Sequence, residues 1–180
     1  IGIKGNSKLF NYDIYGNFGY FKYHVNALEN SFSEIYVGGL LKYKNPSFDV
    51  VSNFEIKKSS DYRLKVDLKS KIFEASYLSA LYEPKIFERI YLGNHYSWEN
   101  NFNSSFVNNL NAKINLENGF ITFSPSINFY TIKDHIYFVG DNHLQADQVI
   151  SFNQFIVDLK LKLLNNKINF DNKFTYNTVS

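Results

Sequence analysis

Cysteine and methionine are absent from this 180-residue chain, and it has only 3 Pro and 9 Gly. Without cysteine, neither a disulfide framework nor a thiolate metal site can form. The chain also lacks a large excess of positive or negative charge. Its net charge is only +2, which gives no electrostatic case for binding nucleic acid. No run of about 18 apolar residues occurs, which excludes a transmembrane helix.

Aromatic residues, in contrast, are abundant: 18 Phe, 14 Tyr and 1 Trp make up 18% of the chain. This content argues against intrinsic disorder. The apolar residues recur at every second position, which is the periodicity of a strand. In the segment 60–72, for example, Tyr62 and Leu64 share one face while Arg63 and Lys65 share the other.

The alternation predicts nine antiparallel strands. In the segment 96–116 the apolar residues stay on the same face throughout. We therefore expect one long strand there, despite the turn-like pair Asn100-Asn101. A phase shift near Ile72 predicts a tight turn. The predicted strands are about 8–23, 33–44, 48–57, 61–71, 73–83, 96–116, 120–138, 149–164 and 167–179.

The length of these strands favours a membrane protein. Strands of globular proteins peak at about 5–6 residues, whereas crossing a bilayer takes about 9–11 tilted residues. Most connections alternate between short turns and long loops, as in outer-membrane barrels, which have short periplasmic turns. We therefore predict an all-β fold, a transmembrane antiparallel up-and-down β-barrel. The alternative is a soluble β-sandwich or small soluble barrel, whose apolar face would be the core.

The strand count predicts that the barrel is larger than this chain. Bacterial single-chain barrels usually have an even number of strands, and about nine or ten are seen here. The chain also begins without Met or a charged and apolar leader. We therefore expect residues 1–180 to form one β-barrel domain that is an internal section of a longer chain.

Several segments, spread over most of the chain, resemble a known family. Residues 91–102 (YLGNHYSWENNF), followed by the strand at 106–116 and by 123–127 (FSPSI), resemble the putative porin family of Bacteroidota outer membranes. Residues 10–16 (FNYDIYG) are similar to barrel strands of that family. The resemblance implies an outer-membrane location and a pore function, and it carries over no named binding residues.

The polar face of the predicted strands supplies the candidate site. So many charges could not be buried in a dry interior, so this face predicts a water-filled lumen. Basic and acidic residues are equal in number on the whole face, which predicts no strong ion selectivity. Some of these residues could form cross-strand pairs that brace the wall. The predicted pore-lining residues are Glu55, Lys57, Arg63, Lys65, Asp67, Lys69, Lys113, Asp158, Lys160, Lys162, Asp171 and Lys173.

Aromatic residues near the strand ends are expected to form the girdles that mark both membrane interfaces, and the alternative is ordinary cross-strand packing. These residues are Tyr20, Tyr23, Tyr43, Tyr62, Tyr96, Trp98, Tyr130 and Tyr176.

No catalytic residue, metal site or cofactor is predicted. Asp134-His135 has no candidate serine nucleophile in a strained turn. The segment Asp141-Asn142-His143, together with Asp147, could bind a divalent cation through loop oxygens, but the pattern favours an ordinary polar loop. The expected partners are outer-membrane lipid and small hydrophilic solutes, with a homo-oligomer or an envelope complex as further possibilities.

The leading hypothesis is therefore a non-enzymatic, porin-like channel in the bacterial outer membrane, through which small hydrophilic solutes diffuse passively. A second hypothesis is a structural or docking barrel whose lumen is plugged. A third is a soluble β-sandwich that acts as a binding module.

Overall fold

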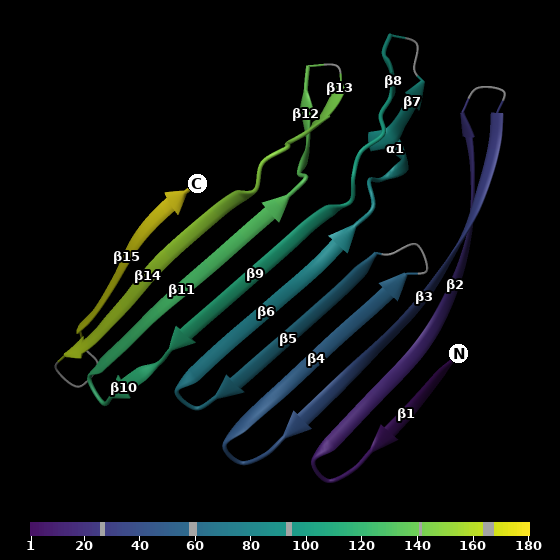
Figure 1. The fold of residues 1–180 in the computed structure, drawn as a ribbon. Coiled ribbons are helices and arrows are strands. Elements are labelled where there is room, and N and C mark those ends of the chain that lie inside the picture. Colours follow the sequence, from purple (N-terminus) through teal and green to yellow (C-terminus); the bar gives the residue numbers. More distant parts are fainter. Residues whose placement is uncertain (26–27, 58–60, 93–94, 141, 164–167) are drawn as a thin grey trace.

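The computed structural model describes residues 1–25, 28–57, 61–92, 95–140, 142–163 and 168–180. One antiparallel sheet dominates it (Figure 1). In spatial order its strands are β1 (Gly2–Asn6), β2 (Phe10–Val25), β3 (Leu28–Lys44), β4 (Phe48–Lys57), β5 (Tyr62–Ser70), β6 (Phe73–Tyr82), β9 (Ser105–Ile114), β11 (Ile121–Lys133), β14 (Ile150–Leu163) and β15 (Ile168–Val179).

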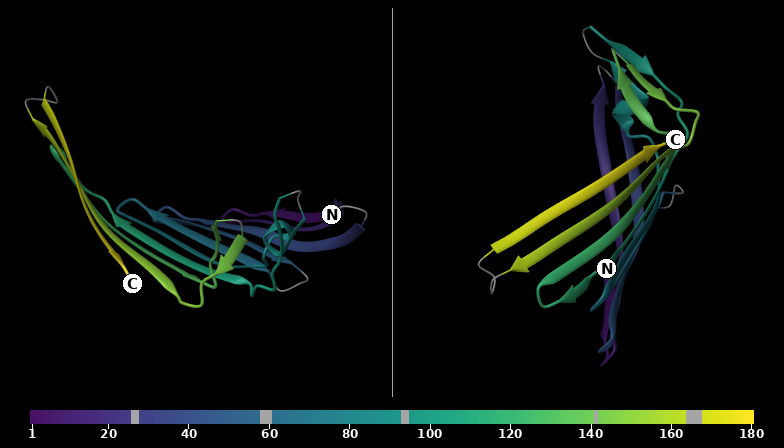
Figure 2. Two further views of the ribbon diagram at one scale, coloured as in Figure 1. Left: turned by 90° about the horizontal axis from the view of Figure 1, so that it is seen from above. Right: turned by 90° about the vertical axis from the view of Figure 1, so that its left-hand side faces the viewer.

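Each strand of this sheet pairs with the strand next to it along the path of the chain, so the topology is up-and-down, as predicted. The sheet is strongly curved and is open between β1 and β15 (Figure 2). Such curvature follows from the right-handed twist that accumulates over many strands. The short strand β10 (Leu116–Asn118) pairs with β11 at one edge of the sheet.

The predicted long strands are confirmed in number and, for the most part, in extent. The segment 48–57 has the predicted bounds, and the turn near Ile72 separates β5 from β6. The chain also forms β1 at its beginning, which the alternation did not predict.

The prediction of one long strand over 96–116 is wrong. The chain forms β8 (Ser97–Glu99), leaves regular structure, and enters the sheet only at β9. Two bonds divert it: the backbone N–H of Asn100 donates to the carbonyl of Arg89 at 2.6 Å, and the backbone N–H of Asn103 donates to the side chain of Gln145 at 3.0 Å. The apolar residues alternate without interruption through this segment, so the sequence pattern gave no sign of the break.

The predicted strand 120–138 is also divided. Asp134 has a positive φ of 56°, a conformation that Asp tolerates better than most residues. The chain turns there out of β11 and forms a separate hairpin of β12 (Ile136–Val139) and β13 (Asn142–Gln145). A second excursion contains α1 (Ile86–Arg89) and the hairpin of β7 (Ile90–Leu92) with β8. Both excursions lie at the same end of the sheet (Figure 1).

The sheet has an apolar face that nothing covers among the described residues. Large side chains on it are well exposed: Phe18 is 65% exposed, Phe174 64% and Tyr176 66%. In the described part of the chain, the buried hydrophobic residues are only Ala80 and Val107, and both lie on the opposite face. The β-sandwich alternative requires a second layer over the apolar face, and the described residues form one layer.

Among the described residues, no helix is long and apolar enough to span a bilayer.

Candidate functional site

The register of the strands places all twelve predicted pore-lining residues on one face, which we call the polar face. Directly paired residues share a face of a sheet. Glu55 pairs with Arg63, and Lys69 pairs with Glu74, which in turn pairs with Lys113. On the last two strands, Asp158 pairs with Lys173 and Lys160 with Asp171. Whether this face lines a pore stays a prediction.

One row of paired residues on the polar face alternates in charge across five strands. Lys44 on β3 pairs with Asp49 on β4, which pairs with Lys69 on β5. Lys69 pairs with Glu74 on β6, and Glu74 pairs with Lys113 on β9. The Lys69 ammonium lies 3.3 Å from the Glu74 carboxylate. This row supports the expectation that opposite charges brace neighbouring strands.

Replacing Glu74 by lysine should therefore destabilise the wall. Three lysines would then stand side by side at positions 69, 74 and 113, and like charges directly opposite one another repel. We expect a loss of about 1 kcal/mol, since these side chains are partly exposed. The measurement is the denaturant midpoint of the detergent-solubilised protein. The double variant E74K/K113E restores a pair of opposite charges between β6 and β9, and position 113 otherwise pairs with Ser126, so this variant adds no new like-charge pair and should regain part of the loss. No recovery would contradict an electrostatic role for the row.

A glycine permits a long contact between strands on the same face. The Tyr15 hydroxyl donates to the Glu55 carboxylate at 2.8 Å, from two strands away. Gly38 lies between them in the row, paired with both residues. A Cβ at position 38 would approach the Tyr15 ring to 2.6 Å, so a side chain there would displace the ring.

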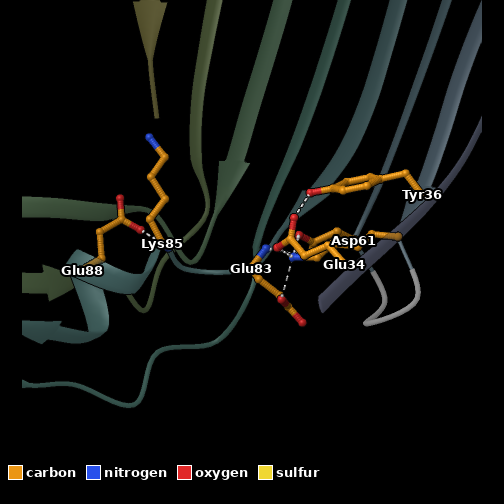
Figure 3. A network of polar contacts seen from close by, with 7 residues as sticks. Glu34, Tyr36, Asp61, Glu83, Lys85 and Glu88 are labelled. Carbon is orange, nitrogen blue, oxygen red and sulfur yellow. Dashed lines mark hydrogen bonds and ion pairs between the residues drawn. The ribbon is translucent and has the colours of Figure 1, made fainter. Parts of the chain in front are cut away.

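A compact ionic cluster, which we call the Lys57 cluster, lies at the end of the polar face that carries the excursions (Figure 3). The Lys57 ammonium lies 2.6 Å from Glu34, 3.4 Å from Glu83 and 3.9 Å from Asp61. The Tyr36 hydroxyl donates to the second oxygen of Glu34. One lysine thus joins β3, β4, the start of β5 and the segment that follows β6.

The Asp61 carboxylate makes two contacts in this cluster. It faces Lys57, and it accepts the backbone N–H of Glu83 at 2.7 Å. Burial raises the pKa of Asp61 above its ordinary value, and the hydrogen bond from Glu83 opposes that rise. The cluster has three carboxylates and one ammonium, so it carries an excess negative charge when all of them are ionised.

The two excursions at this end pack against each other. Trp98 stacks on Tyr91 with ring centroids 4.5 Å apart, and it lies 5.2 Å from the His143 ring of the other hairpin. Phe138 lies 5.1 Å from His143. The side chain of Asn100 donates to that of Asn142 at 3.0 Å. The two loops therefore form one ordered unit.

Trp98 lies on β8, outside the large sheet, and its indole N–H donates to the Phe87 carbonyl within the first excursion, so its girdle role stays a prediction. Tyr130 also differs, because it pairs with Asn109 and Phe152 and so lies on the polar face. Tyr20, Tyr43, Tyr62 and Tyr176 lie on the apolar face, where a girdle role stays a prediction. The side chain of Tyr23 lies outside the described residues.

A groove of about 1040 Å³ separates the Lys57 cluster from the first excursion. One wall consists of Glu34, Lys57, Asp61 and Glu83 at the strand ends. The other wall includes Lys85, Phe87 and Arg89 around α1, with Glu99 and Asn100 from β8 onward. Sequence reasoning missed this groove because it placed Glu99 on a long strand of the wall.

The described residues contain no group of three or more His, Asp or Glu side chains placed to hold a metal ion. Of the loop oxygens considered as a cation site, those of Asp141 lie outside the described residues. Asn142 is engaged through its side-chain oxygen with Asn100 and with the backbone N–H of His143.

A comparison with protein families gives one match: the model of the family described as "Putative porin" matches residues 1–180, the whole chain. No curated protein and no solved structure matches it.

Proposed function

Because this chain belongs to the family described as "Putative porin", we propose that its curved sheet is part of the wall of a water-filled channel through which small hydrophilic solutes diffuse. Family membership makes the chain a porin-like β-structure and implies an outer-membrane location. The polar face lines the lumen in this proposal, and the apolar face contacts lipid. No cofactor takes part.

The observation that carries the proposal is the separation of the two faces across the whole sheet. All twelve charged residues discussed above share one face, and most of the exposed aromatic and aliphatic side chains of the large sheet lie on the other. Placing arginine or lysine on the lipid face near the bilayer midplane costs about 2–4 kcal/mol each, so only one orientation of this sheet is compatible with lipid.

Closure of the wall is part of the proposal. In hydrocarbon, every backbone donor and acceptor needs a partner, so the free edges of β1 and β15 must be paired in the membrane. Further strands of the same protein or a second copy would supply that pairing.

The test is passage of ions and solutes through the purified protein. We expect stepwise conductance in planar bilayers and entry of a small sugar into proteoliposomes. Since the charges on the polar face nearly balance, we expect little preference between cations and anions. Protein that is folded, as judged by a difference in gel mobility between boiled and unboiled samples, yet passes neither ions nor sugar would refute the proposal.

A plugged structural barrel is the second candidate, and one observation favours it. The two excursions form an ordered unit through Trp98 and His143 at one end of the sheet, where such a unit could obstruct the lumen. Co-purification of a stoichiometric partner together with absent conductance would support this candidate.

A further inference from the structure

The groove between the Lys57 cluster and the first excursion has walls of opposite charge. Its strand wall carries Glu34, Asp61 and Glu83 around the single ammonium of Lys57. That wall therefore has a surplus of two negative charges when its carboxyl groups are ionised. Carboxylates can accept several hydrogen bonds each, so they can receive a further ammonium group.

The opposite wall has a positive surplus. Lys85 and Arg89 line it, and neither has an ion-pair partner among the described residues. The Lys85 ammonium lies over the Phe87 ring, 5.6 Å from its centroid, and Figure 3 shows its side chain extending away from Glu88. Glu99 lies on the same side and reduces the surplus to one charge. Arginine suits a carboxylate ligand because its guanidinium group can donate two parallel hydrogen bonds.

From this arrangement we propose that the groove binds zwitterionic solutes, such as free amino acids and short peptides, at the mouth of the channel. The ammonium group of the solute faces Glu34, Asp61 and Glu83, and its carboxylate faces Arg89 and Lys85. The apolar side chains of Tyr82, Ile86 and Phe87 line the same groove and offer contacts to the body of the solute. This inference rests on the proposed channel function.

The charge arrangement discriminates between classes of solute. A zwitterion is attracted at both walls, whereas an anion or a cation is attracted by one wall and repelled by the other. An uncharged solute gains no ionic contact. Because exposed charges are screened within about 8 Å at physiological ionic strength, the preference should weaken at high salt.

The test compares two solutes of similar size in proteoliposomes at low concentration and low salt. Glycylglycine is the zwitterionic probe, and N-acetylglycinamide is the uncharged probe. We expect glycylglycine to enter faster by about three- to tenfold, which corresponds to one good charge contact. The double variant K85E/R89E should bring this ratio close to one. The milder variant Arg89→Gln, which keeps a polar side chain, should lower the ratio by a smaller amount.

Lys71→Glu is the matched control, since it reverses a charge in the turn between β5 and β6 at the opposite end of the sheet. It should leave the ratio as it is in the unmodified protein. Equal entry of both probes, or a preference that K85E/R89E does not alter, would overturn the inference while the channel stands. Exclusion of both probes by folded protein would instead refute the channel itself.

Discussion

Replacing Leu110 by arginine should prevent assembly of most of the protein in the membrane. Leu110 lies in the middle of β9, on the apolar face, between its partners Tyr77 and Phe129. It is 42% exposed, so an arginine there would meet no steric conflict within the sheet, but it would face hydrocarbon. The expected cost is about 2–4 kcal/mol, which is measured as loss of the heat-modifiable band from outer-membrane fractions.

The neighbouring residue provides the control. Asn111 lies on the polar face between Ser76 and Asn128, and it is exposed. Asn111→Arg adds the same side chain to the same strand one position further along. It should assemble as the unmodified protein does. Equal effects of the two substitutions would mean that the two faces do not contact different solvents.

Removing the central cation of the Lys57 cluster should produce the second large effect. Lys57→Met leaves Glu34, Asp61 and Glu83 facing one another without an ammonium group. The Lys57 side chain is only 15% exposed, so its ion pairs are well shielded from water. Removing one partner of a buried ion pair costs about 3–5 kcal/mol, and we expect the lower end of that range at pH 7. The measurement is the denaturant midpoint in detergent.

The pH dependence separates this cause from simple loss of packing. In the variant, repulsion from Glu34 and Glu83 raises the pKa of Asp61 further than burial already does. A carboxyl group whose folded-state pKa is raised destabilises the fold above that pKa, and protonation relieves the loss. The loss of stability caused by Lys57→Met should therefore shrink on acidification, as Asp61 takes up a proton, whereas the unmodified protein loses its Lys57 ion pairs on acidification. If the stability lost in Lys57→Met is the same at pH 7 and at pH 4, repulsion among the carboxylates is not its cause.

The alternation of residues was sufficient to predict the sheet and its two faces. Because the side-chain period of a strand is two, the phase of residues such as Lys65 and Leu64 determines which face each occupies. The same phase correctly grouped Lys69 with Lys113, which are far apart in sequence. The pairing of Lys69 with Glu74 could also have been predicted, since a tight turn at Ile72 fixes the register of β5 and β6.

The excursions could not be predicted in the same way. The apolar phase of Trp98, Phe102 and Phe106 continues unbroken through a segment that leaves the sheet, so periodicity carries no signal of the break. The chain is diverted there by the bond of Asn100 to Arg89 and by the contact of Asn103 with Gln145, which lies 42 positions away. Only Asn100-Asn101 and Asp134 gave local hints, because these residue types favour turns and positive φ.

The Lys57 cluster was predicted only in part. The phase placed Lys57 on the polar face, but Glu83 follows β6 and belongs to no strand. Its approach to Lys57 depends on how the chain leaves the sheet, and α1 and β7 determine that path. The groove has the same origin, since one of its walls is the first excursion.

The most direct test of the account is to map which face of the sheet contacts water in the membrane. The stretch contains no cysteine, so single cysteines can be introduced along β9 without a background signal. The account predicts that a charged, membrane-impermeant maleimide labels cysteines at Asn111 and Lys113 in proteoliposomes. Cysteines at Leu110 and Ala112 should be labelled only after the protein is unfolded in denaturant. Equal labelling at all four positions, or labelling at Leu110 and Ala112 alone, would contradict the claim that the charged face lines a hydrated lumen.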